Sequence, residues 1–125
     1  MAEMKSLLVV EDDTVTREAV GAVLRREGYN VISAANGEEA LVHLRSGLHP
    51  DLVLLDMLMP VLDGWHFLEE IHVEGAPPIP IIVVTATILT RQWAEDHGCL
   101  GFVRKPIESG SLLAEIRRCL ATENG

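Results

Sequence analysis

The stretch LLVVEDD, residues 7–13, decides how the rest of this sequence is interpreted. Its four aliphatic residues, 7–10, are typical of a strand that is buried on both faces of a sheet. Three acids follow with no spacer: Glu11, Asp12 and Asp13. Two like charges about 4 Å apart repel each other by roughly 4 kcal/mol at the effective dielectric of a protein surface. Acids crowded at the end of a buried strand therefore indicate that a cation binds among them.

The bulk properties bound the class of protein. A length of 125 residues predicts one domain, and 48% hydrophobic with only 4% aromatic residues predicts the aliphatic core of an α/β protein. The net charge of −9 argues against direct binding of nucleic acid. Cys99 and Cys119 have no CxxC spacing and are expected to be free thiols of a reducing compartment. The sequence has neither a signal peptide at its start nor an apolar run of about 18 residues, so we expect a cytoplasmic protein that does not bind membranes.

Five apolar runs of strand length alternate with five segments of helical spacing, which predicts right-handed crossovers and a parallel sheet covered on both faces. The fold class is therefore α/β, a (βα)5 doubly wound sheet. Gly28, Gly47 and Gly98 are the expected helix stops, and Ser109 or Ser111 is the expected N-cap of the last helix. The expected strands are 7–10, 31–35, 52–55, 79–84 and 101–103, and the expected helices are 14–27, 38–46, 64–73, 89–97 and 109–122.

Polar residues follow four of these strands, at the sheet edge where open α/β sheets bind ligands. They are Asp12 and Asp13 after the first strand, Asp56 after the third, Thr85 after the fourth and Lys105 after the fifth. Three carboxylates at one edge suit Mg²⁺, which prefers oxygen ligands and binds through one or two carboxylates, waters and phosphate oxygens. Mn²⁺ is the expected substitute.

Each of these residues also has a simpler interpretation when taken alone. Asp13 directly precedes Thr14 and could be a helix N-cap. Asp56 could be a turn residue, Thr85 an ordinary strand residue, and Lys105 a solvated lysine. Their joint placement at four strand ends is much harder to obtain by chance.

The segments VVEDD, LLDMLMPVLDG, VVTA and FVRKP occur in this order along the chain. With them, the sequence resembles the receiver domain of bacterial two-component response regulators over essentially its whole length. The resemblance implies a flavodoxin-like sheet with strand order 2-1-3-4-5. It also implies a single receiver domain over residues 1–125, with a core of about 5–122 and no output domain.

The resemblance implies a role for each site residue. Asp56 would accept a phosphoryl group from a phosphohistidine, with Lys105 and Thr85 contacting the phosphoryl oxygens. Thr85 and Phe102 would form the switch that alters the surface of the fourth helix, fifth strand and fifth helix. Mg²⁺ would bind Asp13, Asp56 and the backbone carbonyl of Leu58, and Asp12 through water. The backbone N–H groups of Met57 and Ala86 would assist at the phosphoryl group, and Pro106 would follow a cis peptide bond.

The expected partners are a sensor histidine kinase or a phosphotransfer protein and an unknown target protein, and the expected state is a monomer or weak homodimer. Such a protein is a signalling switch rather than an enzyme, because it catalyses only its own phosphorylation and dephosphorylation. The alternative is a pseudo-receiver that only binds partners.

Two other α/β families lack support in the sequence. A phosphatase of the haloacid dehalogenase type would need an Asp at the position of Leu58, and a Rossmann domain would need a glycine-rich turn after the first strand. The spacing from Thr85 to Lys105 is short for a receiver, which predicts a shortened fourth helix.

Overall fold

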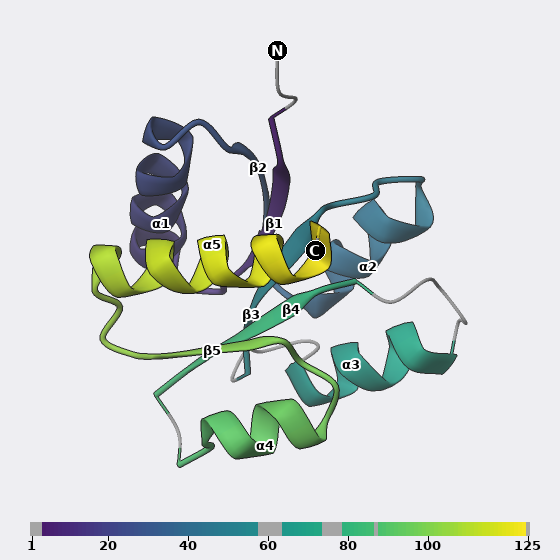
Figure 1. The fold of residues 1–125 in the computed structure, drawn as a ribbon. Coiled ribbons are helices and arrows are strands. Elements are labelled where there is room, and N and C mark those ends of the chain that lie inside the picture. The colour runs from purple at the N-terminus through teal and green to yellow at the C-terminus, as the bar shows by residue number, and fades with distance from the viewer. Residues whose placement is uncertain (1–3, 58–63, 74–78, 87, 125) are drawn as a thin grey trace.

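The computed structural model describes residues 4–57, 64–73, 79–86 and 88–124. Its strands form one parallel sheet in the order β2-β1-β3-β4-β5, which confirms the predicted fold class (Figure 1). The elements are β1 (Ser6–Val10), α1 (Thr14–Arg26), β2 (Asn30–Ala34), α2 (Gly37–Arg45), β3 (Leu52–Asp56), α3 (Gly64–Val73), β4 (Ile81–Thr85), α4 (Arg91–Asp96), β5 (Gly101–Arg104) and α5 (Ser109–Asn124).

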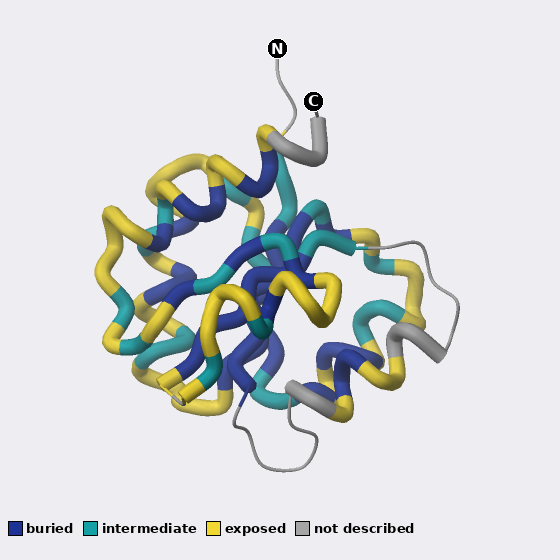
Figure 2. The backbone as a smooth tube through the Cα atoms, turned by 60° about the horizontal axis from the view of Figure 1, so that its bottom comes forward, coloured by how far each residue is buried: buried dark blue, intermediate teal, exposed yellow. Residues whose placement is uncertain are grey.

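Helices cover both faces of the sheet, so the central strands are buried and the core has two halves. Successive strand residues point to opposite faces. Val9 packs with side chains of α1 and α5, whereas Val10 packs with side chains of α2, α3 and α4. Figure 2 shows buried residues along the central strands and exposed residues on the outer sides of the helices. This burial explains why β1, β3 and β4 are continuous aliphatic runs.

Most element boundaries lie within two residues of the sequence prediction, and the starts of β4 and α4 and the N-cap of α5 differ from it for local reasons. Strand β4 begins at Ile81 rather than residue 79, because Pro80 has no N–H to donate to a sheet ladder. Helix α4 spans only Arg91–Asp96, because the Thr90 side chain accepts a hydrogen bond from the Trp93 N–H and caps it there. At the start of α5, the expected N-cap was wrong: the Glu108 carboxylate accepts from the N–H groups of Gly110 and Ser111.

The predicted helix stops are confirmed. Gly28 and Gly98 follow α1 and α4 with φ of 93° and 81°, in the left-handed region that favours glycine. The six-residue α4 agrees with the short spacing between Thr85 and Lys105. Among the described residues, no helix combines the length and the apolar character needed to cross a membrane.

The strand register brings the polar residues to one edge. Val10 pairs with Leu55, Asp56 pairs with Val84, and Thr85 pairs with Arg104. Since all strands run in the same direction, the residues that follow these pairs leave the sheet on the same side. Glu11, Asp56, Thr85 and Lys105 therefore meet although 94 positions separate the first from the last.

Candidate functional site

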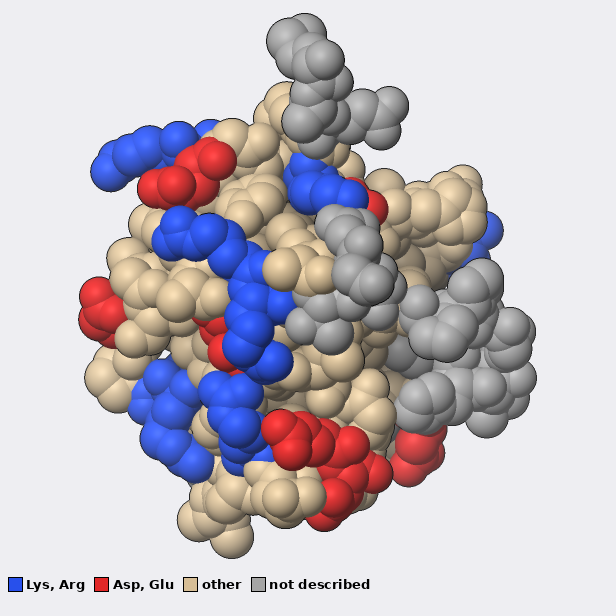
Figure 3. Space-filling view, viewed as in Figure 1, with Lys and Arg blue, Asp and Glu red and all other residues tan. Residues whose placement is uncertain are grey.

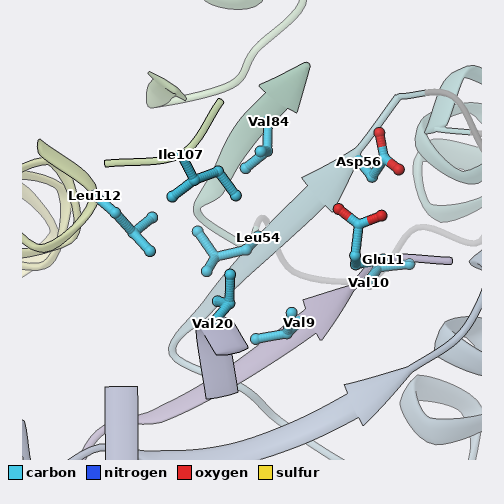
Figure 4. Close-up of a pocket in the computed structure, with 9 residues that line it drawn as sticks. All are labelled: Val9, Val10, Glu11, Val20, Leu54, Asp56, Val84, Ile107 and Leu112. Carbon is cyan, nitrogen blue, oxygen red and sulfur yellow. The ribbon is translucent and has the colours of Figure 1, made fainter. Parts of the chain in front are cut away.

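Three carboxylates from two strand ends converge at this edge. The ligand oxygens of Glu11, Asp12 and Asp56 all lie within 4.8 Å of one another. Glu11 and Asp56 are each only 4% exposed, whereas Asp12 is exposed. Figure 4 shows the Glu11 and Asp56 carboxylates close together beyond the ends of β1 and β3. The group therefore has two buried carboxylates and one that solvent can reach, which leaves room for water ligands on a bound cation.

Lys105 provides the positive charge of this cluster. Its Nζ lies 2.8 Å from Glu11 Oε1 and 3.5 Å from Asp56 Oδ2. Burial lowers the pKa of Lys105, but the hydrogen bond that Lys105 donates to Glu11 and the charges of Asp56 and Glu11 outweigh this effect, so the net pKa is raised and the side chain stays protonated. The Lys105–Pro106 peptide bond is cis. Three carboxylates and one ammonium leave two formal negative charges, which a divalent cation would neutralise.

Asp13 lies outside this cluster, contrary to its expected role as a direct metal ligand. It is the N-cap of α1: Asp13 Oδ2 accepts hydrogen bonds from the Thr16 N–H at 2.8 Å and from the Thr16 hydroxyl at 2.6 Å. These two hydrogen bonds lower the pKa of Asp13. Because its carboxylate is bound to the first turn of the helix, the structure supports the N-cap interpretation that the sequence left open.

Glu11 is the site residue that the sequence interpretation missed. Its Oε1 accepts from Lys105 and its Oε2 accepts from the Asp13 N–H at 3.1 Å, so both carboxylate oxygens are held. The sequence contained a signal for this assignment. If Asp13 is the N-cap of the helix, the two acids left to bind a cation after the first strand are Glu11 and Asp12. In the structure, Glu11 and Asp12 lie together with Asp56 at the sheet edge, and Asp13 caps α1.

The remaining predicted site residues are placed as follows. Thr85 is 1% exposed at the end of β4, beside Asp56 on the neighbouring strand β3, and its carbonyl accepts the Lys105 N–H at 2.9 Å. Phe102 is half-buried in β5, and the Arg104 guanidinium lies 5.1 Å from its ring centroid. Met57 is fully buried and Ala86 is exposed. Leu58, whose carbonyl was expected to bind the metal, lies outside the described residues.

One side of the acidic cluster borders an apolar cavity between the sheet, α1 and α5 (Figure 4). Apolar walls keep the local dielectric low, so the charges of Glu11, Asp56 and Lys105 interact more strongly there than in open solvent. The apolar residues that line the cavity are Val9, Val10, Val20, Leu54, Val84, Ile107 and Leu112.

With this geometry established, comparison with known proteins identifies the family. The model of the response regulator receiver domain matches residues 7–117. The chain belongs to the response regulator receiver family. The matched range includes all five strands except the first residue of β1, and it includes every residue of the acidic cluster.

Similar proteins and solved structures agree with this assignment. Response regulator Rre1 of Synechocystis is 36% identical over 127 residues, covering 98% of this chain and 54% of Rre1. Transcriptional regulatory protein DltR of Streptococcus agalactiae is 39% identical, covering 89% of this chain and 50% of DltR. The crystal structure of a CheY-like receiver domain protein from Methanospirillum hungatei has a TM-score of 0.87 at 27% identity and covers 98% of each chain. The chain spans about half the length of the curated relatives it matches.

Proposed function

We propose that this receiver accepts a phosphoryl group on Asp56, in a reaction that depends on Mg²⁺, and that phosphorylation alters a partner-binding surface. The observation that carries the proposal is the cluster of Glu11, Asp12 and Asp56 with Lys105 at one edge of the sheet. A sensor histidine kinase or a phosphotransfer protein is the proposed donor. The proposed location is the cytoplasm.

The residues present fit a magnesium ion better than a softer metal. All three side chains offer oxygen, which is the ligand type that Mg²⁺ prefers, and the exposed Asp12 lets the ion keep several waters. Asp13 is not included in the proposed ligand set, because its carboxylate caps α1. The backbone carbonyl of Leu58 remains a proposed ligand. When bound, the metal would neutralise negative charge on the phosphoryl oxygens and hold them near Asp56.

In phosphoryl transfer, the protein mainly positions the reacting groups in line and neutralises the charge on the phosphoryl oxygens. An Asp56 carboxylate oxygen forms the new bond to phosphorus on the side opposite the donor. The phosphorus–nitrogen bond to the kinase histidine breaks, and its electron pair returns to the imidazole nitrogen. Lys105, already 3.5 Å from Asp56 Oδ2, would pair with a phosphoryl oxygen, and the Thr85 hydroxyl would donate to another. The N–H groups of Met57 and Ala86 are proposed as further donors.

The proposed switch uses Thr85 and Phe102. If the Thr85 side chain moves toward a phosphoryl group on Asp56, it vacates space on the side of the sheet where Phe102 packs. The half-buried ring would move into that space, which would shift the population of two arrangements of α4, β5 and α5. Phe102 has no hydroxyl, so burial of its ring is the only change by which it would act.

Charge distribution supports a distinct partner surface. Residues 91–118, which contain α4, β5 and the first part of α5, hold five of the ten basic residues but only four of the nineteen acidic ones. Figure 3 shows basic side chains gathered on this face of the molecule. The rest of the chain is strongly acidic, so a partner that contacts this face meets a different electrostatic environment.

The proposal is tested by intact-mass spectrometry after incubation with acetyl phosphate, with and without Mg²⁺. We expect one added phosphoryl group in the wild type only when Mg²⁺ is present, and none in Asp56→Asn. A folded wild-type protein that gains no adduct at any Mg²⁺ concentration, and that also binds no beryllofluoride, would instead indicate a pseudo-receiver that only binds partners.

A further inference from the structure

One residue of α1 contacts the acidic loop although it contributes no carboxylate to it. Arg17 is half-buried, and its Nη1 donates to the carbonyl oxygen of Glu11 at 2.8 Å and to that of Asp12 at 3.3 Å. Its Nη2 lies 3.4 Å from the Thr14 hydroxyl. The guanidinium therefore bridges the backbone of the two neighbouring residues whose carboxylates belong to the cluster.

We propose that Arg17 is a positioning residue for the metal site, an inference that rests on the proposed Mg²⁺-dependent function. Arg17 holds the backbone of Glu11 and Asp12 so that both carboxylates face Asp56. It binds no metal and contacts no reacting atom. It acts on metal binding only by fixing the loop between β1 and α1.

The need for such a residue follows from how this loop is held. The N–H of Glu11 still bonds to β2, through the Ala34 carbonyl at 3.1 Å, and the carboxylate of Glu11 is held by Lys105 and by the Asp13 N–H. Asp12 is exposed, and α1 begins two residues later. The bond from Arg17 to the Asp12 carbonyl links this exposed ligand to the rigid first turns of α1.

Arginine suits this task because of its shape. The guanidinium is planar and presents several N–H donors in a fixed arrangement, so one group can serve two carbonyl oxygens at once. Lysine has one nitrogen on a flexible stem, so it cannot contact the two carbonyls and, through a second nitrogen, the Thr14 hydroxyl from the same position. The N–H of Arg17 also bonds to the Asp13 carbonyl at 2.8 Å, so the backbone of Arg17 is itself fixed in the first turn of the helix.

Electrostatics and positioning predict opposite effects when Arg17 is removed. The positive charge of Arg17 repels a cation at the cluster, so loss of that charge alone would strengthen Mg²⁺ binding. Loss of the backbone bridge would weaken it, because the two carboxylates would no longer be presented together. Replacing a residue that orients metal ligands typically lowers the metal affinity by about tenfold to 100-fold. The sign of the change therefore separates the two effects.

The experiment measures the Mg²⁺ dissociation constant of the full chain by isothermal titration calorimetry. The proteins compared are the wild type, Arg17→Gln, Arg17→Lys and the control Arg26→Gln, which removes the same charge from an exposed position in the last turn of α1. We expect about tenfold weaker binding in Arg17→Gln, clearly weaker binding in Arg17→Lys, and a change below about twofold in the control. Thermal melts without Mg²⁺ establish that each variant is folded, and if Arg17→Gln does not fold, Arg17→Lys decides the result.

A kinetic readout separates positioning from catalysis. With acetyl phosphate as donor, Arg17→Gln should need about tenfold more Mg²⁺ for half-maximal labelling but should reach nearly the wild-type rate at saturation. Unchanged or tighter Mg²⁺ binding in Arg17→Gln, or full recovery of affinity in Arg17→Lys, would overturn the positioning role. If the wild type binds no Mg²⁺, the proposed Mg²⁺-dependent function itself fails. If the wild type binds Mg²⁺ but Arg17→Gln binds it equally well, only the positioning role of Arg17 fails.

Discussion

Asp13 illustrates how a one-residue shift changes the chemistry of the site. Glu11, Asp12 and Asp13 are chemically similar, yet Glu11 is buried against Lys105, Asp12 is the exposed member of the cluster, and Asp13 caps a helix. The helix start explains the difference. The first turn of α1 leaves backbone N–H groups without helical partners, and the carboxylate immediately before it is in position to accept from them.

The N-cap role predicts how Asp13 variants behave. Asp13→Ala should lower the melting temperature by a few degrees, because alanine cannot accept from the Thr16 N–H. Asp13→Asn should melt close to the wild type, because asparagine is an equally good N-cap. Differential scanning calorimetry without Mg²⁺ checks both variants. An Asp13→Ala protein as stable as the wild type would contradict the capping role.

At the scale of elements, a buried carboxylate connects α4, β5 and α5. Glu115 of α5 is 8% exposed, and its Oε2 lies 2.7 Å from Arg91 Nη1 and 3.0 Å from Arg118 Nη2. The same oxygen accepts the Phe102 N–H at 2.9 Å. A methyl group at Gly101 would meet this carboxylate at 2.9 Å, so only glycine lets α5 approach β5 so closely. Glu115 thus fixes the arrangement of the three elements that form the proposed switch surface.

Glu115 also predicts an acid-dependent loss of stability. Burial raises its pKa, but the hydrogen bonds from Arg118, Arg91 and Phe102 outweigh burial and lower the pKa from the usual 4.5 to about 2. A lowered pKa stabilises the fold above pH 4.5, and this contribution is lost as the pH falls toward 2. Because both arginines are about half exposed, solvent screening leaves a contribution of roughly 1–2 kcal/mol.

Urea unfolding of the wild type and Glu115→Gln over a range of pH measures this contribution. The variant should be less stable at pH 7, and the difference between the two proteins should shrink between pH 4.5 and pH 2, where the wild-type carboxylate becomes protonated. A difference that stays constant over that interval would show that ionisation of Glu115 contributes nothing to stability.

At the scale of the whole molecule, the repeating pattern of the chain made the fold predictable. Five aliphatic runs alternate with amphipathic segments, and a parallel sheet covered on both faces is the arrangement that buries all of them. The edge that carries the site follows from the same pattern, because every strand ends there. The strand order came from family resemblance, since the pattern alone does not order the strands.

The details that could not be predicted depend on competition between neighbouring side chains. The acidic pair depends on which of three adjacent acids caps α1, and that choice requires the geometry of Thr16. Similarly, Glu108 rather than a serine caps α5, because its longer side chain reaches the N–H groups of Gly110 and Ser111. The hydrogen bond from Arg17 in α1 to the Glu11 carbonyl at the end of β1 spans six positions, and no sequence motif predicts it.

In the proposed site, Glu11, Asp12 and Asp56, and not Asp13, hold the metal on which phosphorylation of Asp56 depends. The most direct test is the Mg²⁺ dependence of phosphorylation by acetyl phosphate in Asp12→Asn and Asp13→Asn beside the wild type, followed by intact mass. We predict that Asp13→Asn is labelled at wild-type Mg²⁺ concentrations, whereas Asp12→Asn needs at least about tenfold more Mg²⁺ or is not labelled. Loss of labelling in Asp13→Asn, with Asp12→Asn behaving as the wild type, would show instead that Asp13 binds the metal and Asp12 does not.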